Sequence, residues 1–338
     1  MSNNQKRAWY AHSGNIAATS LLVFVASLAA AFIGIVFGQK IIDSVMASSF
    51  SPSQQVAMIN DHLKLTDDAK TIFYASKPSV DGQEQFNQNC QSTERTTAML
   101  GCYYQRKIYL FNITNQELKG AVEVTAAHEM LHAAYERIPF YEKDSVNKLI
   151  LAEYEKVKSD KTIKDLVSYY EKAEPGSVTN EHHSIIGTTV ATIDPKLETY
   201  FARYFTDRQA IVAMNESYNS IFRKVQDEAD LLSKKIEQEG PLIEKSLAAY
   251  EADRKQLEMD IQTFNQRAAS GEFKTQSSFQ VARSAMVSRS NDLNARRDAL
   301  NARVDEYNTL IEKLRALSVR SEELNKSING ISTPKAKL

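Results

Sequence analysis

The five residues from His128 to His132 read His-Glu-Met-Leu-His, and this spacing constrains the local fold more than any other feature of the chain. Residues four apart lie on one face of an α-helix, so both imidazoles can bind a single Zn²⁺ ion. Glu129, beside the first histidine, can accept a proton from a water bound to that ion. The motif therefore predicts an α-helix that carries a zinc site for metal-assisted hydrolysis.

The residues around the motif favour a helix that is packed inside the protein. Thr114 and Glu117 have the spacing of a capping box, which predicts the helix start, and Pro139 predicts its end. Residues 125–127 and 133–135 carry no charge, as expected for a helix that packs beneath a cleft. We favour this interpretation over an exposed helix that carries two histidines and a glutamate by chance.

A catalytic zinc site usually has three protein ligands and one open position, so a further ligand must follow the motif. Residues 133–137 contain no histidine, which excludes the short H-x-x-G-x-x-H pattern. The best candidate segment is residues 180–188, which begins Asn-Glu-His-His-Ser. An N-E-x-x-S element after H-E-x-x-H resembles the gluzincin group of zinc peptidases, in which the third ligand is a glutamate on a later helix. The resemblance covers about residues 52–208.

The resemblance implies a role for each matching residue. His128 and His132 would be zinc ligands, and Glu181 would be the third ligand. Glu129 would act first as the general base and then as the general acid. From the residues alone, Glu181 could instead be a solvated acid or a helix cap. The third ligand could then be one of three rivals: His182, His183 and Glu198.

The candidate segment departs from the gluzincin pattern in one respect. The Asp that usually follows the third ligand is absent, because Ile185 follows Ser184. The carboxylate that orients a ligand histidine in many zinc sites must therefore come from elsewhere in the chain. Asp194 and Asp207 are the candidates for this role.

A peptidase also needs a hydrogen-bond donor for the oxyanion that forms on the scissile carbonyl. His183, two residues past Glu181, is our preferred catalytic donor, ahead of Tyr200 and Arg203. The stretch that contains the last two also has apolar residues at helical spacing, which we assign to the core: Leu197, Phe201 and Phe205.

Two segments before the motif are rich in β-branched and aromatic residues, and we expect both to be strands: residues 71–76 and residues 107–112. Residues 51–65 have the pattern of an amphipathic helix. In the peptidases that the chain resembles, an edge strand just before the motif helix pairs with an extended substrate, which is a general mode of peptide recognition. The second strand is therefore expected to bind a peptide or protein substrate, or to be an ordinary sheet strand.

Residues 16–38 carry no charge and are mostly apolar, and the stretch is long enough for a helix to cross a membrane. Two basic residues precede it, whereas Lys40 and Asp43 after it nearly cancel. The positive-inside rule then predicts a single-pass cell-membrane anchor, with residues 1–15 in the cytoplasm and an extracytoplasmic catalytic domain. A cleaved signal peptide is disfavoured. Signal peptides have a shorter apolar part, which is followed by a cleavage site of small residues, whereas here the small residues lie within the apolar stretch.

Cys90 and Cys102 lie in a polar segment, residues 83–106, between the two expected strands. In an oxidising compartment they can form a disulfide, which would stabilise the fold by roughly a few kcal/mol. As free thiols in the cytosol, the two cysteines would have no evident function. As zinc ligands they are disfavoured, because the chain contains no C-x-x-C pair.

The composition of residues 207–330 shifts toward Ala, Glu, Lys, Arg, Leu, Gln and Asn. Apolar residues recur there in two heptad stretches: Leu247, Tyr250, Leu257, Ile261, Phe264 and Ala268, then Leu293, Leu300, Val304, Tyr307, Ile311 and Leu314. Residues 270–275 break the pattern, so we expect an antiparallel coiled-coil hairpin, followed by a tail at 331–338. Gly240-Pro241 predicts a kink or a third short helix. We expect the hairpin to be a rigid spacer, an arm for self-association, or an arm that positions substrate or a protein partner over the cleft.

The net charge of the chain is −1, so no basic surface predicts nucleic-acid binding. Residues 39–206 suffice for one catalytic domain, which we expect to be a small zincin-like α+β domain with a short sheet and the active-site helix. The whole chain is then predicted to be a membrane-anchored zinc metallopeptidase. The alternatives are a coiled-coil scaffold protein with a vestigial or structural zinc site, and a zinc hydrolase of non-peptide amide bonds in the cell envelope.

Overall fold

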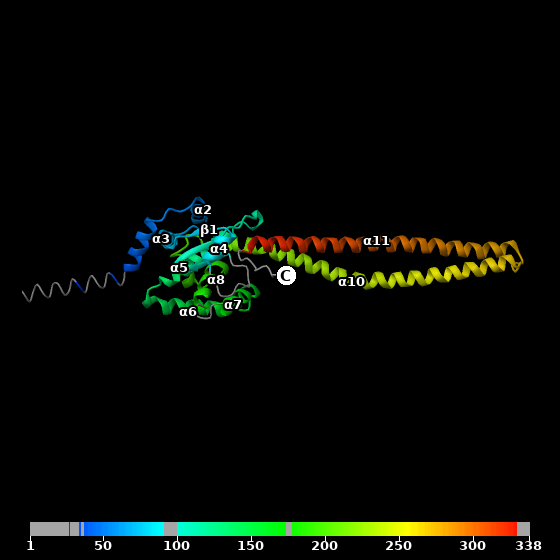
Figure 1. The fold of residues 1–338 in the computed structure, drawn as a ribbon. Helices are drawn as coiled ribbons and strands as arrows, with labels where there is room; N and C mark the ends of the chain where they lie inside the picture. Colours follow the sequence, from blue (N-terminus) through cyan, green and yellow to red (C-terminus); the bar gives the residue numbers. More distant parts are fainter. Residues whose placement is uncertain (1–26, 28–33, 35–36, 91–99, 174–177, 330–338) are drawn as a thin grey trace, which may run out of the picture. The chain divides into compact units, whose positions relative to one another are not determined.

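The residues that the computed structural model describes are 27, 34, 37–90, 100–173 and 178–329 (Figure 1). The chain divides into two compact units. The first runs to Asn219 and also includes the residues from Lys326 onward, and the second is Ser220–Asn325.

Helices dominate the first unit. Residues 37–48 are helical, and the helices that follow are α2 (Gln54–Leu63), α3 (Asp67–Ala75), α4 (Gln83–Asn89), α5 (Ala121–Glu136), α6 (Phe140–Val157), α7 (Lys161–Ala173), α8 (Val178–Thr189) and α9 (Pro195–Phe201). The described strands form one sheet in the order β1-β3-β2: β1 (Ser79–Asp81), β2 (Gly101–Tyr104) and β3 (Lys107–Phe111). The expected α+β class is therefore wrong, because the described structure is predominantly helical and its sheet has three short strands.

The prediction of a strand over residues 71–76 is wrong, because most of this segment lies in helix α3. The Thr66 side chain caps the helix by accepting a hydrogen bond from the Ala69 N–H. Two aspartates follow in the first turn, where the helix dipole favours negative charge. Ala69 and Phe73, one turn apart, are fully buried. The capped helix with one buried face outweighs the strand propensity of the β-branched and aromatic side chains.

The second expected strand, residues 107–112, is confirmed as β3, and it lies at the centre of the sheet. It pairs in parallel with β1 and antiparallel with β2. Gln105 and Arg106 join β2 to β3 with φ angles of 50° and 60°, as a two-residue type I′ hairpin turn requires. The edge strand next to the motif helix is therefore β2, which the residue pattern does not predict.

A disulfide joins Cys90, just after α4, to Cys102 in β2, which is the pairing that the sequence left open. Phe86 of α4 also packs against Phe111 of β3, with ring centroids 5.7 Å apart. The edge strand is thus held by backbone pairing with β3 and by a covalent link to α4.

The core of the first unit surrounds α5, which contacts α2, α3, α8 and the sheet. Its largest buried apolar side chains come from several elements: Phe73, Ile108, Leu110, Met130, Leu131, Ile150, Ile185, Ile186 and Phe201. The amphipathic helix expected over residues 51–65 is confirmed as α2, which packs Val56, Ile59 and Leu63 into this core. Because α5 is central, its motif residues are held from several directions.

The second unit is a pair of long helices, α10 (Arg208–Ala269), which begins in the first unit, and α11 (Gln276–Ile328). Figure 1 shows the two helices side by side, joined where the heptad pattern breaks at residues 270–275. The expected pairing of two long helices over residues 207–330 is thus present. Apolar side chains are buried along the pair: Val225, Leu232 and Leu257 on α10, and Leu293, Leu317 and Leu324 on α11.

Two details of the expected hairpin differ in the structure. No third short helix begins at Gly240-Pro241, since α10 runs through the proline, whereas a kink there stays a prediction. Beside it, the Arg303 guanidinium of α11 donates two hydrogen bonds to Glu239, at 2.9 and 2.7 Å, which link the two helices at this point. Leu247 is 47 % exposed rather than buried between the helices.

The expected membrane anchor is also corrected. Across the part of the chain that the structure describes, no helix combines the length and the apolar character needed to cross a membrane. Most of residues 16–38, on which the expectation rested, lie outside the described residues, as do residues 1–15 and 331–338. The single-pass cell-membrane location and the extracytoplasmic placement of the catalytic domain are therefore not retained.

Candidate metal centre

Helix α5 carries the H-E-x-x-H motif, and it begins later than the capping box predicts. Asn115 accepts a hydrogen bond from the Glu117 N–H and starts a short 3-10 turn, η1 (Gln116–Leu118). Gly120 then separates this turn from α5 with a φ of 95°, a conformation that glycine adopts at little cost. The helix ends at Glu136, before Pro139, as expected.

The motif lies in the buried part of α5. Glu129 and His132 are 6 % and 7 % exposed. Apolar residues on either side are fully or almost fully buried: Ala126, Ala127, Met130, Leu131, Ala133 and Ala134. This burial excludes the alternative of an exposed helix that carries the motif by chance.

Helix α8 brings Glu181 to the two histidines of α5. The helix is buried from Glu181 to Thr188. At Gly187, an added Cβ would lie 2.5 Å from Leu131 Cδ1 and 2.8 Å from Phe201 Cε1, so no larger residue fits without a shift. The missing side chain lets α8 pack closely against α5, and this contact places the carboxylate opposite both imidazoles.

The three candidate ligand atoms form a compact triangle. The Nε2 atoms of His128 and His132 are 3.1 Å apart. Glu181 Oε2 lies 3.5 Å from the first Nε2, and Glu181 Oε1 lies 3.4 Å from the second. Donor atoms bound about 2.1 Å from one tetrahedral ion are about 3.4 Å apart. The triangle has the right size, and these residues are close enough to bind a metal ion.

The electrostatics of this group also suit a cation. Burial lowers the pKa of His128 to about 4, so its imidazole is neutral near pH 7 and its lone pair is available to a metal. Glu181 is only 4 % exposed, and a buried carboxylate is costly unless a positive charge lies beside it. A divalent metal ion at this position would supply such a charge.

A cavity of about 450 Å³ opens at these residues. Glu129 lines it beside the candidate ligands, together with residues 100–103 at the edge strand and with Asn215, Tyr218 and Asn219 of α10. At Gly101, an added Cβ would lie 2.4 Å from Thr125 Cγ2 and 3.1 Å from Glu129 Cγ. The lack of a side chain at Gly101 thus lets the edge strand lie directly against Glu129.

The structure places His183 away from this cavity. Its side chain is fully buried, and its Nε2 lies 2.9 Å from the Tyr200 hydroxyl. Arg203 pairs with Glu142 at 2.6 Å. None of the three expected donors for the oxyanion is among the described residues that line the cavity. Tyr218 does line it, and burial raises the pKa of this phenol to about 12, so its hydroxyl keeps its proton.

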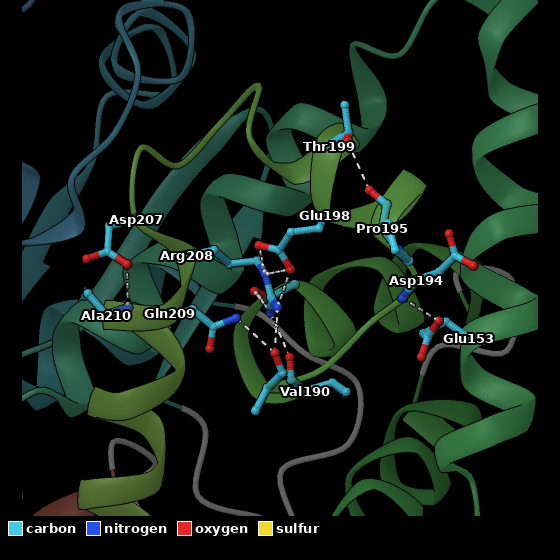
Figure 2. Close-up of polar contacts among 12 residues, drawn as sticks. Glu153, Val190, Asp194, Pro195, Glu198, Thr199, Asp207, Arg208, Gln209 and Ala210 are labelled. Carbon is cyan, nitrogen blue, oxygen red and sulfur yellow. Dashed lines mark hydrogen bonds and ion pairs between the residues drawn. The ribbon is translucent and has the colours of Figure 1, made fainter.

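Figure 2 shows where the other candidate carboxylates lie. Glu198, a rival ligand, accepts hydrogen bonds from the guanidinium of Arg208, the shortest from Nη2 at 2.6 Å. Asp194 accepts a hydrogen bond from a backbone N–H at the start of α9, and Asp207 does so at the start of α10. The latter two serve as helix caps rather than as partners of a ligand histidine.

His182, the remaining rival ligand, stacks on Tyr154 with ring centroids 3.8 Å apart. Arg208 donates to the backbone carbonyls of Val190 and Ala191, at 2.7 and 3.0 Å, just after α8 ends (Figure 2). This buried guanidinium caps the helix that carries the candidate carboxylate ligand, and it connects that helix to the start of α10.

No family model, curated protein or solved structure matches this chain, so its function is inferred from the geometry of the site. The residue pattern predicts the candidate ligands but misses Gly101, Gly187 and Tyr218. A glycine inside a helix costs about 1 kcal/mol relative to alanine, and this cost at Gly187 is a signal of close packing. The other two carry no comparable signal, because their roles depend on contacts between distant segments.

Proposed function

We propose that this protein is a zinc-dependent metallopeptidase. The observation that carries the proposal is the convergence of His128, His132 and Glu181 with Glu129 in one cavity. Two histidines and one carboxylate leave one position of a tetrahedral zinc ion open, as in catalytic zinc sites. The same ligand set is typical of the gluzincin-type peptidases, which the two short motifs resemble.

The donor chemistry supports zinc as the metal. Imidazole nitrogen and carboxylate oxygen in a small tetrahedral site suit this ion better than they suit magnesium or calcium, which prefer more oxygen ligands. When bound, zinc supplies Lewis-acid chemistry: it polarises a carbonyl and lowers the pKa of water toward about 7. The remaining steps of the reaction fall to the side chains that line the cavity.

Glu129 is the proposed general base and general acid. Its side chain lines the cavity one residue after His128 on α5 and is almost fully buried. The carboxylate accepts the proton of the attacking water and then delivers that proton to the amine that leaves. The contact with Gly101 restricts the Glu129 side chain, which supports an oriented carboxylate at this position.

Tyr218 is the proposed donor to the oxyanion of the transition state. It lines the cavity, and its raised pKa keeps the hydroxyl protonated at neutral pH. A donor directed at developing negative charge lowers the barrier of acyl transfer. We therefore assign to Tyr218 the role that the sequence suggested for His183, whose imidazole is buried against Tyr200.

The edge strand β2 supports a peptide as the substrate. The Phe111 N–H donates to the Leu100 carbonyl, so in the antiparallel register Cys102 also directs its backbone groups toward β3. Gly101 and Tyr103 then direct their N–H and C=O groups away from the sheet. An extended peptide pairs with such an edge, and here that edge borders the cavity.

The substitution Glu129→Gln tests the proposal. It removes the proton acceptor but keeps the shape of the side chain, so kcat/KM on a fluorogenic peptide library should fall at least about 100-fold. The zinc content per chain should stay at the wild-type value. Glu84→Gln, at an exposed position in the first turn of α4, is the matched control and should keep the wild-type kcat/KM and the wild-type zinc content. Unchanged hydrolysis by the Glu129→Gln protein would show that the proposal is wrong.

Other results would favour the alternatives. A zinc-loaded wild-type protein that cleaves no peptide, with full cellular function of the Glu129→Gln variant, would indicate a scaffold protein with a structural metal site. Cleavage of a non-peptide amide alone would indicate a different zinc hydrolase. Self-association or partner binding through the α10–α11 pair stays a prediction. Among the described strands, β2 forms the edge of the sheet at the cavity, and this is the reason to place the peptidase first.

A further inference from the structure

Glu136 lines the same cavity as the proposed catalytic residues. It follows His132 by four residues and Glu129 by seven, so it lies on the same face of α5, about 10 Å along the helix from Glu129. Its Oε2 accepts a hydrogen bond from the Tyr103 hydroxyl at 2.7 Å. The carboxylate is thus held beside the edge strand, two residues along β2 from Gly101.

Helix stability does not explain a carboxylate at Glu136. It is the last residue of α5, where the helix dipole favours a basic side chain, and the last turn contains none. Only one of its oxygens is engaged, because Oε1 makes no hydrogen bond to the described residues. Burial and this hydrogen bond raise the pKa of Tyr103 to about 12, so the phenol remains a donor.

Two cations near Glu136 make their direct hydrogen bonds to other groups, although Arg137 also donates to the Tyr103 hydroxyl at 3.2 Å and Lys143 interacts electrostatically with Glu136. Arg137 forms a bidentate pair with Asp43, at 2.8 and 2.9 Å. The Lys143 ammonium donates to the Tyr135 carbonyl at 2.6 Å and lies 3.5 Å from the centre of the Tyr135 ring. Neither Arg137 nor Lys143 is among the residues that line the cavity, so Glu136 presents negative charge to it.

We propose that Glu136 makes the cavity select substrates that carry a lysine or arginine side chain near the cleaved bond. This inference rests on the proposed peptidase function. Glu129 and Glu181 balance the charge of a divalent ion, and Glu136 then adds a further carboxylate, with one oxygen that no described residue hydrogen-bonds. A substrate ammonium or guanidinium pairs with the free carboxylate oxygen, whereas an acidic substrate side chain is repelled.

The position of Glu136 also limits where the basic side chain lies. Strand residues two apart are separated by about 7 Å. Gly101 borders Glu129 and Tyr103 borders Glu136. A peptide that follows β2 therefore reaches Glu136 within about two residues of the bond at Glu129.

The test uses fluorogenic peptides that differ only in one residue, lysine, glutamine or glutamate, placed in turn at each position within two residues of the cleaved bond. At one of these positions, the wild-type kcat/KM should be at least about tenfold higher with lysine than with glutamate. Glu136→Gln should remove this ratio, and Glu136→Arg should reverse it. Both variants should keep the wild-type zinc content, and Glu84→Gln should keep the wild-type ratio.

A binding measurement provides a second readout. In the zinc-loaded Glu129→Gln protein, the lysine peptide should bind about tenfold tighter than the glutamate peptide, and adding Glu136→Gln should equalise the two Kd values. Equal wild-type rates on both peptides, or a lysine preference that survives in Glu136→Gln, would overturn the inference and leave the peptidase intact. Failure of the wild-type protein to cleave any peptide would overturn the proposed function and this inference together.

Discussion

The unit that holds the candidate metal centre and the α10–α11 pair bury their side chains in different ways. Around α5, neighbouring helices and the sheet bury both charged and apolar residues, as Glu129 and His132 illustrate. Along the helix pair, burial is confined to a narrow seam, where Leu257 is 6 % exposed while Leu247 is 47 % exposed. Packing from several directions fixes the positions of single side chains, whereas a two-helix seam fixes little beyond the alignment of the helices.

The largest expected difference between the two regions concerns leucine truncation. Leu131 is fully buried between α5 and α8, whereas Leu247 is largely exposed on α10. Leu131→Ala should lower the free energy of unfolding of the metal-bearing unit by about 2–5 kcal/mol, because it leaves a cavity in a core that cannot collapse around it. Leu247→Ala should cost less than about 1 kcal/mol.

Urea denaturation, with hydrogen exchange to assign each transition to one unit, would measure both costs. Loss of zinc should accompany Leu131→Ala, because the substitution loosens the contact between α5 and α8. Similar costs for the two substitutions would contradict the comparison of the two regions.

The ion pairs of the two regions provide the next test. Arg137 and Asp43 are 6 % and 5 % exposed, whereas Arg303 and Glu239 are each 37 % exposed. Arg137→Met leaves the buried Asp43 carboxylate without its positive partner, with only the hydrogen bond from Gln39 remaining, and should cost about 3 kcal/mol of unfolding free energy. Arg303→Met should change it by less than about 1 kcal/mol.

Thermal and urea unfolding of each variant would measure this difference. The double substitution Asp43→Leu with Arg137→Met should recover much of the stability, because no charge is then buried alone. An Arg303→Met protein that loses as much stability as Arg137→Met would show that the helix pair relies on its ion pairs more than its exposure indicates.

A smaller effect is expected where the edge strand meets the catalytic helix. Gly101→Ala should lower kcat/KM about tenfold, which corresponds to about 1.4 kcal/mol, because the new methyl group pushes β2 away from Thr125 and Glu129. The zinc content should not change. Gly82→Ala is the matched control, since an added Cβ there meets nothing within 4 Å. A fully active Gly101→Ala protein would show that the contact with Glu129 is dispensable.

The local features of this chain were predictable, because each follows from a short spacing. The i, i+4 pattern of His128 and His132 requires one helix face, and the heptads require long helices that pair. The bridge between Cys90 and Cys102 was only a possibility from the sequence, because it depended on an oxidising compartment. The position of Glu181 opposite the histidines was implied by the resemblance of one short motif to the gluzincins, with rival ligands left open.

The features that the sequence did not predict depend on contacts between distant segments. The cap at Thr66 and the burial of Phe73 turn an expected strand into α3. The edge strand β2 is recognised only once the order of the sheet is known. Tyr218 reaches the cavity from α10, more than eighty residues after the motif, and no local pattern marks it.

The metal content of the purified protein tests the central claim most directly. After dialysis against buffer with trace zinc, elemental analysis should find about one zinc ion per chain in the wild-type protein. The same value is expected for His62→Ala, which removes an exposed histidine paired with Glu123. His132→Ala and Glu181→Gln should each lose the metal, because each removes one of three ligands. A metal-free wild-type protein, or full zinc occupancy in Glu181→Gln, would contradict the account.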